Sequence, residues 1–236
     1  MSMLEVHGVE SGYGEVQILW GVTLGLEQGK LTTLVGANGS GKTTLLRAIT
    51  GLLHTWKGTV TFEGKDVTRV SPHEKADMGI VMVPEGRQLF TDMTVLENLE
   101  LGATPGHARA EYQQTLDWVF ELFPRLKERT KQVSGTMSGG EQQMLAIARG
   151  LMSKPKVLMF DELSLGLSPL LVLNLFEILN KLKSQGYTML LVEQNIQMAL
   201  AVSDYAYVMS HGRIEIQGTA HEVRQRPDVK KAYLGV

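Results

Sequence analysis

The most informative stretch of this chain reads Gly36-Ala-Asn-Gly-Ser-Gly-Lys-Thr43 and fits the pattern G-x-x-x-x-G-K-[ST] of a phosphate-binding loop. It follows a short apolar run, residues 31–35, and leads into a helical pattern over residues 42–49. Glycines let backbone N–H groups curl around a phosphate, and a helix N-terminus adds partial positive charge. The alternative is a glycine-rich turn that merely joins a strand to a helix. The stretch predicts a strand–loop–helix unit that holds a nucleotide's phosphates.

The polar residues of this loop have expected roles at such a nucleotide. Lys42 would neutralise the β- and γ-phosphates, and the Thr43 hydroxyl would be a ligand of Mg²⁺. The residues expected to bind the nucleotide are Gly36, Asn38, Gly39, Ser40, Gly41, Lys42, Thr43 and Thr44.

A second stretch, Val157-Leu-Met-Phe-Asp-Glu162, reads as a buried strand that ends in two adjacent carboxylates. A parallel sheet presents groups at the carboxyl ends of its strands. Asp161 is expected to hold Mg²⁺, and Glu162 to orient or deprotonate the attacking water. Acidic pairs also occur after strands simply as charge at a helix N-terminus, so the pair alone is ambiguous. Together with Lys42 and Thr43, it predicts a site of nucleotide hydrolysis.

The order of elements predicts an α/β fold with a P-loop NTPase core and a mainly parallel sheet. Four runs read as its strands, and helical stretches separate them. Short alternating segments in residues 1–30 and 58–68 predict flanking antiparallel strands, and His211-Gly212 predicts a hairpin turn. We expect one domain over residues 1–236, with residues 92–151 as an inserted helical lobe and residues 1–91 and 152–236 as the core. The four expected strands are Leu31 to Val35, Gly79 to Val83, Lys156 to Phe160 and Thr188 to Val192.

Composition excludes several classes of protein. The chain has 236 residues, 23 Lys plus Arg against 25 Asp plus Glu, and no cysteine. The near-neutral balance argues against bulk affinity for nucleic acid, and the absence of cysteine excludes disulfide scaffolds and thiolate zinc sites. No apolar run approaches the length of a membrane span, and the N-terminus has no secretory pattern. We therefore expect a cytoplasmic protein that needs a partner if it works at a membrane.

The stretch Met137-Ser-Gly-Gly-Glu-Gln-Gln143 resembles the signature motif of ABC-transporter ATP-binding cassettes, and the order of motifs along the whole chain matches that family. The resemblance implies ATP as the nucleotide and a head-to-tail dimer in which this turn binds the partner's γ-phosphate. The residues so assigned are Ser138, Gly139, Gly140 and Glu141. Glu141 is also spaced to form a capping box with Ser138, and both readings can hold together.

The resemblance implies further site residues and shows some departures. Tyr13 corresponds to the aromatic that stacks on adenine, although a lone aromatic beside a turn is more often packing. Glu85 stands where most cassettes have a Gln that contacts Mg²⁺ and the attacking water. Gln194 stands where most have a His that contacts the γ-phosphate, so it cannot carry a proton's charge. Leu163 and Ser168 replace a usual Pro and Asp.

More narrowly, the chain resembles the LivF-type cassettes of branched-chain amino-acid importers, through Val83-Pro-Glu-Gly-Arg87, Val192-Glu-Gln-Asn195 and the terminal Tyr233-Leu-Gly. This implies an ATPase that energises an importer at the cytoplasmic face of the membrane. The implied partners are integral-membrane permease subunits, a second cassette and, indirectly, a solute-binding protein outside the membrane. Arg87 is expected as a surface charge, with contact to a partner or nucleotide as the alternative.

Three other functions stay open from the sequence. One is a cassette that acts on nucleic acid or ribosomes, although the interval between Glu85 and Ser138 leaves no room for long inserted coiled coils and no basic block is present. Another is an importer cassette for a small polar solute such as urea. A third is a nucleotide-binding regulator without useful hydrolysis, suggested by Glu85 and Gln194.

Overall fold

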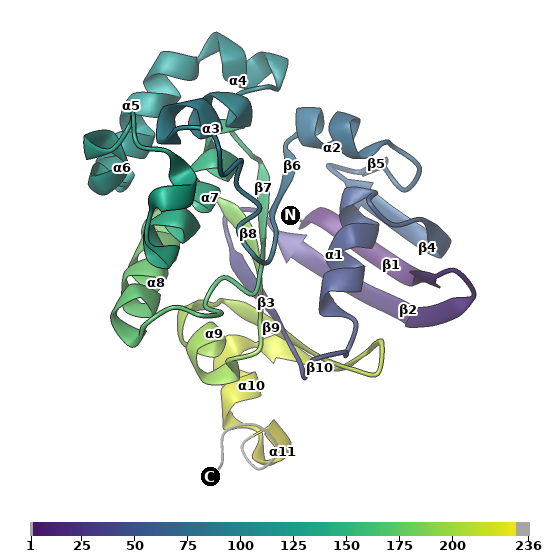
Figure 1. The fold of residues 1–236 in the computed structure, drawn as a ribbon. Helices are drawn as coiled ribbons and strands as arrows, with labels where there is room; N and C mark the ends of the chain where they lie inside the picture. The colour runs from purple at the N-terminus through teal and green to yellow at the C-terminus, as the bar shows by residue number, and fades with distance from the viewer. Residues whose placement is uncertain (1, 230–236) are drawn as a thin grey trace.

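The computed structural model describes residues 2–229 and contains two β-sheets with helices between and beside them (Figure 1). The terminal Tyr233-Leu-Gly lies outside the described residues. The larger sheet has six strands in the order β10-β9-β3-β8-β7-β6. All its neighbouring strands are parallel except β10, which pairs antiparallel with β9. The strands are β3 (Leu31–Val35), β6 (Ile80–Val83), β7 (Val157–Asp161), β8 (Thr188–Glu193), β9 (Tyr205–Ser210) and β10 (Arg213–Thr219).

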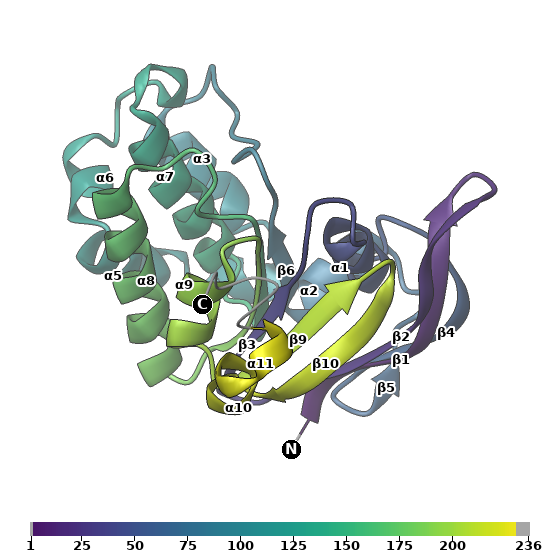
Figure 2. The same cartoon turned by 90° about the horizontal axis from the view of Figure 1, so that it is seen from below.

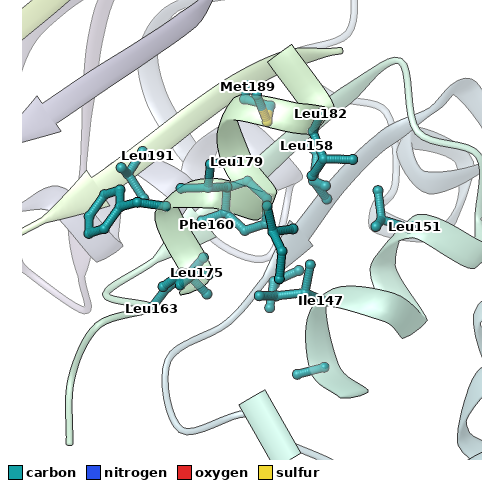
Figure 3. Close-up of a cluster of buried hydrophobic side chains, with 14 of the residues drawn as sticks. Ile147, Leu151, Leu158, Phe160, Leu163, Leu175, Leu179, Leu182, Met189 and Leu191 are labelled. Atoms are coloured by element: carbon teal, nitrogen blue, oxygen red, sulfur yellow. The ribbon is translucent and has the colours of Figure 1, made fainter. Parts of the chain in front are cut away.

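The apolar character of the central strands follows from burial on both faces of the sheet. Val157 and Met159 of β7 join the apolar cluster on one face, which includes α1 (Lys42–Thr50). Leu158 and Phe160 alternate with them and join the cluster on the other face, where α7 (Gly139–Met152) and α8 (Pro169–Ser184) pack (Figure 3). This explains why the strands read as continuous apolar runs. The four strands expected from the sequence are confirmed, with bounds that differ by one residue at three of them.

The smaller sheet is antiparallel, as expected, with the order β2-β1-β4-β5. Its strands are β1 (Ser2–Tyr13), β2 (Val16–Glu27), β4 (Thr55–Phe62) and β5 (Lys65–Asp66). Helix α1 lies between the two sheets (Figure 2), and its Leu45, Leu46 and Ile49 share one apolar cluster with Leu34 of β3 and Val60 of β4. The helix that begins at the phosphate loop is therefore packed from both sides.

Between β6 and β7 the chain is helical, and most of these helices lie on the opposite side of the central sheet from the smaller sheet (Figures 1 and 2). Capping boxes form at the starts of α2, α3 and α7, where Ser71, Thr94 and Ser138 are the N-caps. The remaining helices are α2 (Pro72–Met78), α3 (Val95–Gly102), α4 (Gly106–Ala110), α5 (Tyr112–Leu122), α6 (Pro124–Glu128), η1 (Ser134–Thr136), α9 (Ile196–Val202), α10 (Ala220–Gln225) and α11 (Pro227–Val229). Within residues 2–229, no helix has both the length and the apolar character to span a bilayer.

Candidate active site

The phosphate loop connects β3 to α1, and its backbone conformation requires glycine. Gly39 and Gly41 have φ values of 77° and 108°, which side chains rarely adopt. A Cβ at Gly36 would lie 2.3 Å from the backbone oxygen of Met209 in the neighbouring strand β9. Ser40 is buried, and its hydroxyl has no hydrogen-bond partner. The loop is therefore a tight turn in which the buried hydroxyl of Ser40 makes no hydrogen bond.

Lys42, the first residue of α1, curls back over this loop. Its side chain is 3% exposed, and its ammonium group donates hydrogen bonds to the backbone oxygens of Gly36 at 2.9 Å and Ala37 at 3.2 Å. It also pairs with Glu162, with 3.3 Å between Nζ and Oε1. A single cation therefore connects the loop to the acidic pair predicted after β7.

Thr43 and Asp161 meet as the sequence predicts for two ligands of one cation. The Thr43 hydroxyl donates a hydrogen bond of 3.1 Å to Oδ1 of Asp161. Burial raises the pKa of Asp161 to about 6, and the charges of Glu162 and Glu85 act in the same direction, while the Thr43 hydrogen bond and Lys42 oppose it. The Thr43 hydroxyl and the Asp161 carboxylate supply oxygen donors of the kind that Mg²⁺ prefers, and as a pair they fit this ion. Residues 2–229 contain no group of three or more His, Cys, Asp or Glu side chains that could hold a metal ion by themselves.

Glu162 sits on a constrained backbone. Its φ of 47° lies in the left-handed region, which costs about 1–2 kcal/mol for a residue with a Cβ. Its N–H donates to the backbone oxygen of Val192 in β8 at 2.9 Å, which fixes the turn out of the sheet. The carboxylate is thereby directed at Lys42.

A cavity of about 410 Å³ collects these groups at the carboxyl ends of the parallel strands. Glu85, which follows β6, and Gln194, which follows β8, line it together with the loop. Ile18 and Leu165 also line it, and sequence reasoning missed both because nothing local distinguishes them from other apolar residues. The full lining is Ile18, Asn38, Gly39, Gly41, Lys42, Thr43, Thr44, Glu85, Glu162, Leu165 and Gln194.

A larger cleft of about 510 Å³ lies at the opposite ends of the strands, lined by residues such as Glu27, Lys30 and Tyr205. It contains no phosphate loop and none of the predicted site residues. The smaller cavity is therefore the candidate active site.

Three predicted residues, Gly36, Ser40 and Asp161, do not line this cavity themselves, although Asp161 is bonded to Thr43, which does. Two further groups of predicted residues also do not line it. Tyr13 ends β1, is 43% exposed, and accepts a hydrogen bond of 3.2 Å from Arg47 of α1. Residues 138–141 form the start of α7 instead. Their place outside this chain's own cavity agrees with the expectation that they face a partner's nucleotide, and both assignments stay predictions.

The start of α7 is a capping box that charged residues surround. The N–H of Ser138 donates to Glu141 at 3.0 Å, and Glu141 pairs with Arg129 at 2.9 Å. Arg87 is half-buried and donates to the side chain of Gln142 at 2.9 Å, close enough to Gly139 that a Cβ there would meet its guanidinium at 2.9 Å. Arg87 thus connects the loop after β6 to α7 within this chain and is not simply a surface charge.

Comparison with known families resolves what kind of site this is. The family model described as ABC transporter matches residues 19–164. The chain belongs to this family. It is an ATP-binding cassette, and the activity of such cassettes is ATP hydrolysis.

The cassette is similar along its whole length to transport proteins. It is 46% identical to the high-affinity branched-chain amino acid transport ATP-binding protein BraG of Pseudomonas aeruginosa, over 99% of this chain and 100% of the relative. It is 38% identical to a probable branched-chain amino acid transport ATP-binding protein, LivF, of Archaeoglobus fulgidus, over 99% of each chain. The expected LivF-type resemblance is confirmed.

Solved structures confirm the expected fold. An ATP-binding cassette of an ABC transporter in its ADP conformation has a TM-score of 0.86 and 32% identity, covering 100% of both chains. A nucleotide-free cassette has a TM-score of 0.85 and 31% identity, covering 97% of each chain.

Proposed function

We propose that this cassette is the ATP-hydrolysing subunit of an importer for branched-chain or other hydrophobic amino acids. The observation that carries the proposal is the cavity that joins the phosphate loop, Glu162, Glu85 and Gln194, with Asp161 bonded to Thr43 of the loop. The full-length similarity to BraG and LivF supports the solute class.

In the proposed mechanism, the phosphates of ATP lie in the loop and draw Lys42 away from its backbone partners. Lys42 then balances the phosphate charge and releases the ion pair with Glu162. Glu162 accepts a proton from the attacking water, and Gln194 donates a hydrogen bond to the γ-phosphate.

Thr43, Asp161 and Glu85 are the residues that would hold Mg²⁺. When bound, the ion supplies positive charge to the phosphate oxygens as the terminal phosphate leaves. It would also offset the effect of burial, the main cause that raises the pKa of Asp161, and the weaker effect of repulsion by Glu162 and Glu85.

The proposed assembly contains a second cassette, either another copy or a related chain. Leu165, Leu170 and Leu173 are exposed on the loop after Glu162 and the start of α8, beside the cavity that Leu165 lines. Such apolar side chains are typical of a surface that a partner covers. In the dimer, residues 138–141 of one cassette would bind the γ-phosphate held by the other.

The helical lobe, residues 92–151, is the proposed link to the membrane. Closure and opening of the two cassettes would move this lobe and pass the movement to permease subunits, at the cytoplasmic face. A solute-binding protein outside the membrane would deliver the amino acid to those subunits.

The role of Glu162 is tested by Glu162→Gln, which keeps the shape of the side chain and removes the base. Steady ATP turnover should be abolished while ATP stays bound and the dimer stays closed. Glu177→Gln, on an exposed position of α8, is the matched control and should turn over ATP normally. Normal turnover by Glu162→Gln would remove Glu162 from the mechanism.

The transport role is tested by vesicles that contain permease subunits co-purified with the cassette. ATP-dependent uptake of leucine, isoleucine or valine supports the proposal. Uptake of urea alone, or ATPase that responds to DNA or ribosomes and not to the permeases, would contradict it.

A further inference from the structure

Glu193 is a buried carboxylate to which the proposed mechanism gives no role. It is the last residue of β8, directly before Gln194, and is 2% exposed. Its two oxygens accept hydrogen bonds from one residue, Ser164: Oε1 from the N–H at 3.0 Å and Oε2 from the hydroxyl at 2.8 Å. Ser164 lies two positions after Glu162, so the contact links the end of β8 to the loop that carries the proposed base.

Burial of the Glu193 carboxylate lowers the stability of the folded protein. Burial raises the pKa of Glu193, and the nearby charge of Glu162 acts in the same direction, while the hydrogen bonds from Ser164 oppose both. An apolar residue here would avoid the desolvation of a charge. Local features that reduce stability in this way are typical of functional sites.

Few backbone hydrogen bonds attach the loop 162–168 to the sheet. It begins with the left-handed backbone of Glu162, and its internal hydrogen bonds are turns, from Leu165 N–H to Glu162 at 3.3 Å and from Leu167 N–H to Ser164 at 3.2 Å. Turns set the shape of a loop and do not fix it to the sheet. The first residue of the loop is tied to β8 through the bond from the Glu162 N–H to Val192, and the two bonds from Ser164 to Glu193 extend this attachment into the loop. Strand β8 is a firm support because it is a central strand with neighbours on both sides.

We infer that Glu193 is a positioning residue for ATP hydrolysis: by holding Ser164, it fixes the loop 162–168 so that the Glu162 carboxylate stays directed into the phosphate cavity. A neighbouring cavity of about 360 Å³ has Glu162, Ser164, Glu193 and Gln194 in its lining. Glu193 therefore contacts the loop that a partner cassette would touch and directly precedes Gln194, which is proposed to bind the γ-phosphate. This inference rests on the proposed role of Glu162.

The test measures kcat and the KM for ATP of the purified full-length chain with Mg²⁺. Glu193→Ala should lower kcat about tenfold or more, since small displacements of a reacting group have effects of this size, and should leave KM within about twofold. Glu193→Gln should restore most of kcat, because an amide can accept from the Ser164 N–H and donate to its hydroxyl. Wild-type kcat in Glu193→Ala, or KM and kcat changed alike, overturns the inference.

Ser164→Ala provides a second measurement, on a half-buried residue, and removes only the hydroxyl bond to Glu193. It should lower kcat in the same direction, and the double variant with Glu193→Ala should be no slower than Glu193→Ala alone within about twofold. Fully additive losses would show that the two residues act separately and would contradict the inference.

A matched control exists on α10. Glu222 is exposed and does not line the cavity; it likewise accepts from the N–H and the hydroxyl of one residue, Thr219, at 2.9 and 2.8 Å, although both bonds end on Oε2. Glu222→Ala should leave kcat unchanged, and a loss equal to that of Glu193→Ala would reveal a general effect on folding. Glu162→Gln in the same assay separates the two proposals. If Glu162→Gln retains turnover, the proposed role of Glu162 fails. If Glu162→Gln loses turnover and Glu193→Ala does not, only the role of Glu193 fails.

Discussion

Lys75 offers a quantitative test of the energetics of a buried charge at the end of α1 opposite the phosphate loop. It lies on α2 with its side chain fully buried, and its ammonium group donates a hydrogen bond of 2.7 Å to the backbone oxygen of Ile49, in the last turn of α1. Burial lowers the pKa of Lys75 from 10.5 to about 8, while the charge of Asp66 opposes this. Protonation of Lys75 is therefore less favourable in the folded protein than in the unfolded chain.

The size and sign of the effect on stability follow from this pKa. At about 1.4 kcal/mol per pH unit, the drop corresponds to about 3 kcal/mol. Below pH 8, Lys75 is protonated in both states, and the folded state bears the whole cost. Between pH 8 and 10.5 the folded state loses its proton first, so the cost declines as pH rises. Above pH 10.5 it is gone.

The assay is urea unfolding of the wild type and Lys75→Met at pH 7.5, 9 and 10.5. Methionine has a similar length and no charge. The substitution also removes the bond from Lys75 to Ile49, which adds to the difference in free energy of unfolding an offset that does not depend on pH. The free energy of unfolding of the wild type should rise by about 3 kcal/mol relative to Lys75→Met across this range. Lys65→Met, at an exposed position on β5, should show no such trend. A difference that does not change with pH would refute the reasoning and show that the carbonyl groups at the end of α1 sustain the charge.

Three further outcomes are expected. Gln194→His should raise kcat about fivefold, because a charged donor strengthens a hydrogen bond by about 1 kcal/mol; unchanged kcat in steady-state assays would show that this position does not limit turnover. Asp161→Asn should raise the Mg²⁺ concentration for half-maximal ATPase roughly tenfold, and a magnesium titration that matches the wild type would exclude Asp161 as a ligand. Arg87→Ala should lower the free energy of unfolding, measured in urea, by about 1 kcal/mol because it removes the bond to Gln142. Arg109→Ala, at an exposed position, should not lower it. If Arg87→Ala is as stable as the wild type, the bond to Gln142 contributes nothing to stability.

The sequence predicts those parts of the fold whose signals are local. The phosphate loop, the N-cap at Ser138 and the apolar strand before Asp161 each combine periodicity with punctuation in one short stretch, and each forms as expected. Strands β9 and β10 gave a weaker signal, because their tyrosines and alternating polar residues do not form an apolar run; only their turn at residues 211–212 was predicted.

Contacts between distant segments escaped prediction for a physical reason. The bond between Glu193 and Ser164 exists because β7 and β8 are neighbours in the sheet, and strand order is not written in either segment. The bond between Arg87 and Gln142 depends on how α7 packs beside the loop after β6. Ile18 reaches the cavity from the smaller sheet. The residue types indicated the chemistry of the site. The hydrogen bonds that hold its side chains in place became visible only from the packing of helices and strands.

The placement of α1 between two sheets has a consequence for which parts of the cassette can move. A helix gripped by apolar side chains on both flanks has little freedom to tilt, so the nucleotide cradle at its tip is the stationary part during a catalytic cycle. Displacement must then fall to segments outside this sandwich. Substitutions in those outer helices would therefore leave the geometry of the phosphate loop unchanged.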